Sequence, residues 1–133
     1  MLARAQRANR TGLPDKLLVE IALLDDEAMC RANREVFGKS GTTDVITLYY
    51  PSVNPAILPA ADILVNLDLA LVESGGALRS RNWNPACELA LYVAHGCDHL
   101  CGADDHLPAA RRRMLARERR WVRAEDALVQ ALL

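Results

Sequence analysis

The sequence has little net charge, few aromatic residues and no apolar run long enough to span a bilayer. Sixteen basic residues against seventeen acidic residues leave a formal net charge of −1, which excludes the strongly basic composition of many nucleic-acid-binding proteins. The start of the chain also lacks the apolar segment of a secretory signal. We therefore expect a soluble, cytoplasmic protein with no membrane partner.

The cysteines are irregularly placed. The four cysteines, Cys30, Cys87, Cys97 and Cys101, form neither a CxxC pair nor a regular framework. We expect reduced, buried thiols and no disulfide-linked partner. Because a chain of this length with 51% apolar residues can bury an adequate core without a metal, any metal that it binds is expected to be functional.

The pattern of strands and helices predicts an α+β fold. Segments 17–24, 44–50 and 62–66 have the apolar and β-branched composition of strands, and the proline-rich segment 51–59 predicts a loop. Helices are expected over 25–38, 68–75, 84–101 and from 108 onward. Residues 1–16 predict a tail or a short helix. Residues 17–133 are then one domain, a small mixed β-sheet covered by helices around a central helix.

The helix over 84–101 is expected to run through the core. It starts with the N-cap pair Asn84-Pro85, ends at Gly102, and is apolar around most of its circumference. In the final helix, apolar pairs recur every seven residues. We expect this stripe to pack on the central helix through Leu115, Val122 and Val129.

All three histidines lie within the segment 95–106. His95 and His99 are four residues apart on the predicted helix, so both imidazoles lie on one face and supply half of a tetrahedral metal site. A left-handed turn at Gly102 lets a third ligand return to the metal. The candidates are Asp104, Asp105 and His106.

The site differs from that of zinc proteases of the H-E-x-x-H type, because Gly96 stands where those enzymes have their glutamate base. Asp98 is the nearest carboxylate on the helix and is our candidate catalytic residue, as a contact to metal-bound water or as a group that orients a ligand. Cys97 and Cys101 point away from the histidines. With nitrogen ligands and no thiolate nearby, one Zn²⁺ per chain is the expected cofactor.

The segment 95–106, HGCDHLCGADDH, resembles the signature H-G-x-L-H-L-x-G-Y-D-H of the YbeY family of bacterial endoribonucleases. The segment 33–51 is similar to the family's N-R-E-Y-R-x-x-D-x-P-T-D-V-L-S-F-P, and ADILVN at 61–66 also fits. The resemblance covers roughly residues 17–125. In its register, Asp105 takes the place of the family's third histidine, six residues after His99, and His106 follows one position later, so either residue could complete the site.

The resemblance implies a cytoplasmic, zinc-dependent and single-strand-specific endoribonuclease. Such a hydrolase acts in the 3′-end maturation of small-subunit rRNA and in ribosome quality control, with ribosomal RNA and the ribosome or its assembly factors as partners. The family commonly has an arginine where this chain has Phe37. The candidate RNA-binding residues here are Arg34, Lys39, Arg79, Arg81 and the arginines of 111–113.

Two other functions remain compatible with these residues. One is a metal-dependent hydrolase of another substrate. The other is a ribosome-assembly or RNA-binding factor in which a structural metal only braces the fold, an interpretation favoured by the missing arginine. Removal of the metal should unfold such a factor, whereas it should leave a metal-dependent enzyme folded and inactive.

Overall fold

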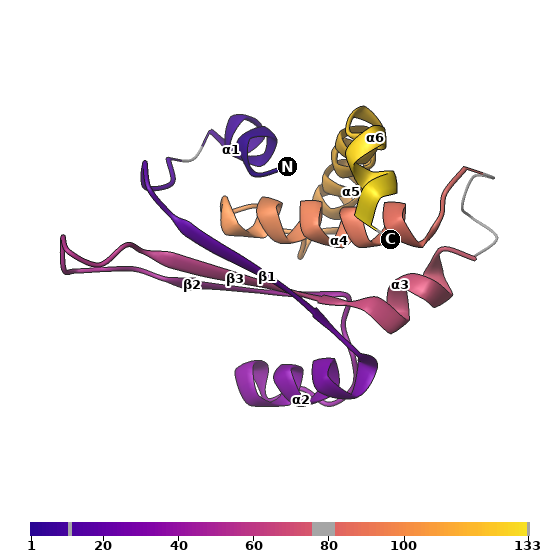
Figure 1. The fold of residues 1–133 in the computed structure, drawn as a ribbon, viewed down its shortest axis with the longest axis horizontal. Helices are drawn as coiled ribbons and strands as arrows, with labels where there is room; N and C mark the ends of the chain where they lie inside the picture. The colour runs from indigo at the N-terminus through magenta and orange to yellow at the C-terminus, as the bar shows by residue number, and fades with distance from the viewer. Residues whose placement is uncertain (11, 76–81, 133) are drawn as a thin grey trace.

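The computed structural model describes residues 1–10, 12–75 and 82–132 (Figure 1). Its sheet has the strands β1 (Leu18–Leu24), β2 (Val45–Tyr50) and β3 (Ala60–Asn66) in the order β1-β3-β2. The central strand β3 is parallel to β1 and antiparallel to β2. The sheet is therefore small and mixed, as predicted, and β2 forms one of its edges.

The helices of the described residues are α1 (Leu2–Asn9), α2 (Asp26–Phe37), α3 (Leu67–Glu73), α4 (Pro85–Leu100), α5 (Pro108–Ala124) and α6 (Asp126–Val129), followed by the short 3-10 turn η1 (Gln130–Leu132). Together with the sheet they confirm the α+β class. None of these helices combines the length and the apolarity that a membrane span requires.

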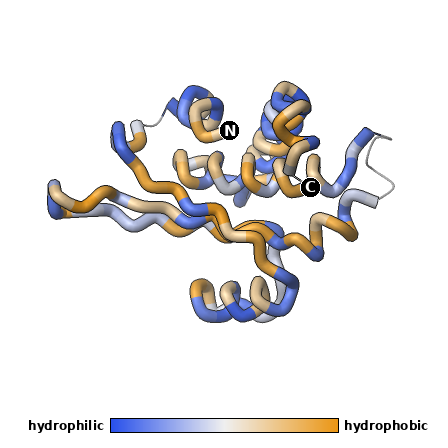
Figure 2. Tube along the Cα trace, in the orientation of Figure 1, coloured by the Kyte–Doolittle hydropathy of each residue, from blue (hydrophilic) through white to orange (hydrophobic). Residues whose placement is uncertain are grey.

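Helix α4 lies on one face of the sheet and α2 on the other (Figure 1). Helix α4 begins and ends where the sequence predicts. The Asn84 side chain caps its start by accepting a hydrogen bond from the Cys87 amide, and the helix ends at the predicted turn. Most of its residues are buried, which confirms its predicted central position. Figure 2 shows the longest hydrophobic stretches on the strands, whereas α2 alternates between hydrophilic and hydrophobic residues.

The final helix packs on α4 as expected, with one correction. Val122 and Val129 are buried in one apolar cluster with residues of α4, and Leu115 packs against that cluster. The expected single helix, however, is divided at Glu125 into α5 and α6. In α6, Leu128 is 69% exposed, whereas its neighbour Val129 is buried.

The first residues of the chain form the helix α1 rather than a tail. Ala5 is fully buried in the core, and the Arg4 guanidinium pairs with the Glu125 carboxylate at 3.0 Å. Cys87, Cys97 and Cys101 are buried and Cys30 is half-buried, with no disulfide among the described residues. This arrangement agrees with the expectation of reduced thiols.

Candidate metal centre

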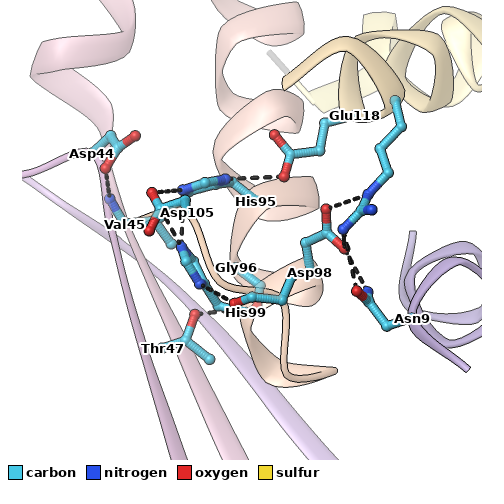
Figure 3. Close-up of polar contacts among 12 residues, drawn as sticks. Asn9, Asp44, Val45, Thr47, His95, Gly96, Asp98, His99, Asp105 and Glu118 are labelled. Atoms are coloured by element: carbon cyan, nitrogen blue, oxygen red, sulfur yellow. Dashed lines mark hydrogen bonds and ion pairs between the residues drawn. The ribbon is translucent and has the colours of Figure 1, made fainter. Parts of the chain in front are cut away.

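The side chains of His95, His99 and Asp105 converge at the C-terminal end of α4 (Figure 3). The Nε2 atoms of the two histidines are 3.0 Å apart, and Asp105 Oδ2 lies 3.7 Å from the first and 3.9 Å from the second. Tetrahedral zinc with bonds of 2.0 to 2.1 Å separates its ligand atoms by roughly 3.3 to 3.4 Å. The three observed separations bracket this value, so one metal ion fits between the three atoms.

Asp105 reaches the histidines because of the way α4 ends. Gly102 adopts a left-handed conformation with φ of 87°, which glycine accepts at little cost. The Ala103 amide then donates to the Asp98 carbonyl at 3.0 Å, and the Gly102 amide donates to the His99 carbonyl at 2.9 Å. These two bonds form a Schellman cap, which reverses the chain and directs the following loop back along α4.

The second ring nitrogen of each histidine is held by a hydrogen bond. His99 Nδ1 donates to the Ala103 carbonyl at 3.0 Å, and His95 Nδ1 lies 2.9 Å from Glu118 Oε1. A neutral imidazole carries one proton, so donation from Nδ1 leaves a lone pair on each Nε2. Two lone pairs and a carboxylate oxygen then face one another, which is favourable only around a cation. The contacts at Nδ1 are also those typical of histidines that bind metals.

Glu118 on α5 is fully buried beside His95. Burial raises the pKa of Glu118, while the hydrogen bond and positive charge of His95 lower it and the negative charge of Asp98 raises it again. Burial alone would lower the pKa of His95, but the bond to Glu118 and the charges of Glu118, Asp44 and Asp105 raise it overall. The site therefore attracts positive charge, whether a proton or a metal ion.

Sequence spacing does not reveal Glu118, which lies 23 residues from His95. One signal was available. Glu118 falls between Met114 and Trp121, on the apolar face of the final helix, where an isolated carboxylate needs a buried partner. A histidine across the helix pair is a suitable partner.

The structure does not bring Asp98 into this group. Its carboxylate is fully buried and accepts two hydrogen bonds from Arg117, from Nε at 2.8 Å and from Nη2 at 2.7 Å. Asn9 Nδ2 donates a third at 2.7 Å. These contacts give no support to the predicted catalytic role, because the carboxylate is held between α1, α4 and α5 on another side of the helix (Figure 3).

Of the three candidates for the third ligand, the geometry favours Asp105. The His106 side chain is 90% exposed, and its Nδ1 lies 3.9 Å from the Asp104 carboxylate, which is also exposed. The Asp105 side chain is 23% exposed and faces both histidines. Asp104, Asp105 and His106 can form a second, overlapping group, but one that is mostly exposed.

Gly96 lies where α4 and the sheet are in close contact. A Cβ atom at this position would lie 2.6 Å from Ile63 Cγ2 and 3.1 Å from the side chains of Val45 and Thr47. The residue after the first histidine thus faces the sheet, not the metal group. The packing explains why the glutamate of the zinc proteases has no place here.

A cavity of about 550 Å³ opens beside the metal group. Its lining includes the metal group His95, His99 and Asp105, together with His106. Asp44, residues of β2, Phe37, Lys39 and Arg111 also line it. Lys39, one of the predicted RNA contacts, lines this cavity, and so does Arg111 of the arginine cluster. Arg34 is exposed on α2 and is not among the lining residues. The predicted contacts Arg79 and Arg81 fall outside the described residues.

Comparisons with a family model and with individual known proteins point to the same family. The family model described as endoribonuclease YbeY matches residues 2–125. The chain is 36% identical over 118 residues to the endoribonuclease YbeY of Anaeromyxobacter sp. strain Fw109-5, covering 86% of this chain and 57% of the relative. It is 35% identical over 106 residues to that of Myxococcus xanthus, covering 75% and 34%.

A third relative, the endoribonuclease YbeY of Wolinella succinogenes, is 37% identical over 86 residues, covering 65% of this chain and 57% of the relative. The chain thus spans between about a third and three fifths of the length of these three proteins. The matched region includes the histidine segment, the Schellman cap and Glu118.

Proposed function

Because this chain belongs to the YbeY endoribonuclease family, we propose that it is a metal-dependent endoribonuclease that cleaves single-stranded RNA. Its proposed role is the 3′-end maturation of small-subunit rRNA in ribosome biogenesis and quality control. The proposed partners are ribosomal RNA and the ribosome or its assembly factors, and the proposed location is the cytoplasm. The family of these relatives supports the activity, and the metal group supports the dependence on a metal ion.

The observation that carries this proposal is that His95 and His99 are both fixed by a hydrogen bond at Nδ1. Both Nδ1 atoms face an acceptor, and both Nε2 atoms face Asp105. We propose that His95, His99 and Asp105 bind one Zn²⁺, because two imidazoles and one carboxylate form a common ligand set of catalytic zinc. When bound, the metal supplies a Lewis acid for a phosphoryl oxygen and lowers the pKa of a water ligand.

The chain's own residues position and orient the reacting groups. Glu118 and the Ala103 carbonyl hold the proton of each histidine on Nδ1, which fixes the imidazole planes. Lys39 lies on the cavity wall, where its charge suits an RNA phosphate. Arg34, Arg79 and Arg81 remain predicted contacts to RNA. Asp98 acts on the group indirectly, through its place beside Glu118.

Metal content and RNA cleavage test the proposal together. The purified protein should carry about one equivalent of transition metal and cleave a single-stranded RNA. Replacing His95 and His99 together with alanine should remove both properties. Metal retained at full occupancy in that variant would disprove the site. Cleavage that survives both chelation and the double replacement would disprove the metal-dependent reaction.

The third ligand has its own test. Asp105→Ala should lower metal affinity at least as much as the loss of a group that supports a ligand, roughly 10- to 100-fold, and the matched control His106→Ala should do less. The opposite ranking would assign the metal to His106. If chelation lowers the melting temperature strongly and the metal-loaded protein cleaves no RNA, the metal is structural and the protein is a binding or assembly factor.

A further inference from the structure

Phe37 is the only phenylalanine of the chain, and it is not part of the core. It is the last residue of α2, and 52% of it is exposed. It lines the same cavity as His95 and His99. An aromatic side chain left open to a polar cavity is more informative than a scattered surface apolar residue, because nothing in the packing of the described residues accounts for its position.

One cation lies over this ring, and a second lines the same cavity. Lys39 Nζ lies 5.8 Å from the centre of the Phe37 ring, and Arg111 lines the same cavity from the first turn of α5. Both cations are exposed, and neither makes an ion pair with another described residue. Asp44 and Asp105 add negative charge near the histidines. The arrangement places positive charge beside the aromatic ring and leaves the carboxylates at the metal group.

The cavity continues around the edge of the sheet. Its lining comes from α4 on one face, from Val45, Ile46 and Thr47 of the edge strand β2, and from the end of α2, which covers the other face (Figure 1). Its volume lies within the range of ligand pockets, about 300 to 1,000 Å³. Such a shape suits an extended ligand that reaches from the histidines to Phe37.

We propose that Phe37 stacks on an unpaired nucleobase of the RNA, while Lys39 and Arg111 contact the neighbouring phosphates. The bound strand then runs along the β2 edge, with a phosphate at the metal group and a base on the ring. Proteins that bind single strands combine such aromatic platforms with cations in this way. The inference rests on the proposed function and adds the residue that selects an unpaired base.

Binding of a labelled single-stranded oligoribonucleotide to the metal-free chain tests the stacking without cleavage. Phe37→Ala should weaken binding roughly 5- to 150-fold, and Phe37→Trp should restore it. The matched control Val36→Ala, which alters an exposed apolar residue of the same helix, should leave binding unchanged. On an oligonucleotide with abasic sites throughout, Phe37→Ala should have no effect.

The cations should behave differently from the ring. Lys39→Gln and Arg111→Gln should weaken binding of the normal and the abasic strand equally, and each should reduce the salt dependence of binding. The stacking proposal is overturned if Phe37→Ala binds the normal strand as well as the unaltered chain does, if it loses affinity for the abasic strand too, or if a fully paired duplex binds as well as the single strand.

These results are distinguishable from failure of the proposed function. If the unaltered, metal-loaded chain cleaves no RNA but shows the dependence on Phe37 and on the base, the stacking site stands and the nuclease activity does not. If Phe37→Ala changes the sedimentation of the protein alone, the ring contacts a second copy of the chain and the stacking proposal fails.

Discussion

Among single residues, Glu118 determines which nitrogen of His95 carries the proton and how strongly the imidazole binds a metal. It accepts the Nδ1 proton at 2.9 Å from a fully buried position, so the Nε2 lone pair is aimed at the metal group. A buried anion also makes the imidazole a stronger base and so a better metal ligand. Only the second effect requires a charged oxygen, because a neutral carbonyl also accepts an Nδ1 proton, as at His99.

Replacing Glu118 with glutamine should therefore lower metal affinity roughly 10- to 100-fold, because the amide keeps the volume of the side chain and loses the charge. Isothermal titration with Zn²⁺ measures the change. Glu125→Gln, at the residue that caps the end of α5 and pairs with Arg4, is the control and should leave affinity unchanged. Equal affinities of the three proteins would mean that Glu118 supports packing alone.

Individual site residues could be predicted only where the chain itself brings them together. His95 and His99 share a helix face because they are four residues apart, and Gly102 indicates the turn that returns Asp105 to them. Glu118 belongs to another helix, and no spacing along the chain reports a contact between helices. Asp98 was assigned by its nearness in sequence, but its side chain leaves the helix toward Arg117.

At the scale of elements, the approach of α4 to the sheet depends on one missing side chain. The space above Ile63 cannot hold a Cβ at position 96, and Thr47 Oγ1 donates to the Gly96 carbonyl at 3.2 Å. This contact sets how deeply the helix lies against β2 and β3. It also sets the position of His95 and His99 relative to the cavity, because both histidines are close to Gly96 on the same helix.

Gly96→Ala should destabilise the protein by about 1 to 3 kcal/mol, because the added methyl group overpacks a tight interface. Denaturant unfolding measures this loss of free energy. The cost should be smaller in the background Ile63→Ala, which removes the atom closest to the new methyl group. Additive costs in the double variant would show that the glycine is required for another reason.

Most elements were predictable because their signals are local. The strands begin and end within two residues of their predicted limits, and α4 has its cap at Asn84. The division of the last helix at Glu125 was missed. The sequence continues without glycine or proline there, and the division accompanies contacts made by α1, through Arg4, and by α4.

At the scale of the whole molecule, Asp98 joins three helices from distant parts of the chain. It accepts hydrogen bonds from Arg117 on α5 and from Asn9 on α1, and Arg117 Nη2 also donates to Asn9 Oδ1 at 3.2 Å. Asp98 is fully buried, whereas the Arg117 side chain is 21% exposed. Helix α1, for which the sequence predicted only a tail or a short helix, is thereby joined to α4, which carries the histidines.

This asymmetry of exposure predicts an asymmetry of cost. Arg117→Gln leaves a buried carboxylate without its cation and should lower the free energy of unfolding by about 3 to 5 kcal/mol. Asp98→Asn should cost less, because the partly exposed guanidinium can turn to water. Thermal or denaturant unfolding of both single variants and of the double variant measures the loss of stability in each and the coupling between the two residues. A smaller loss for Arg117→Gln than for Asp98→Asn would contradict this description of the network.

The same variant decides what Asp98 does for the reaction. If it only ties the helices together, Asp98→Asn should keep its metal and, well below its melting temperature, cleave single-stranded RNA at close to the normal rate. A folded variant that binds metal normally but loses cleavage more than about 100-fold would instead show that Asp98 takes part in the chemistry. The contacts of Asp98 with Arg117 and Asn9 lead us to expect the first outcome, in which the carboxylate stabilises the site from behind the helix.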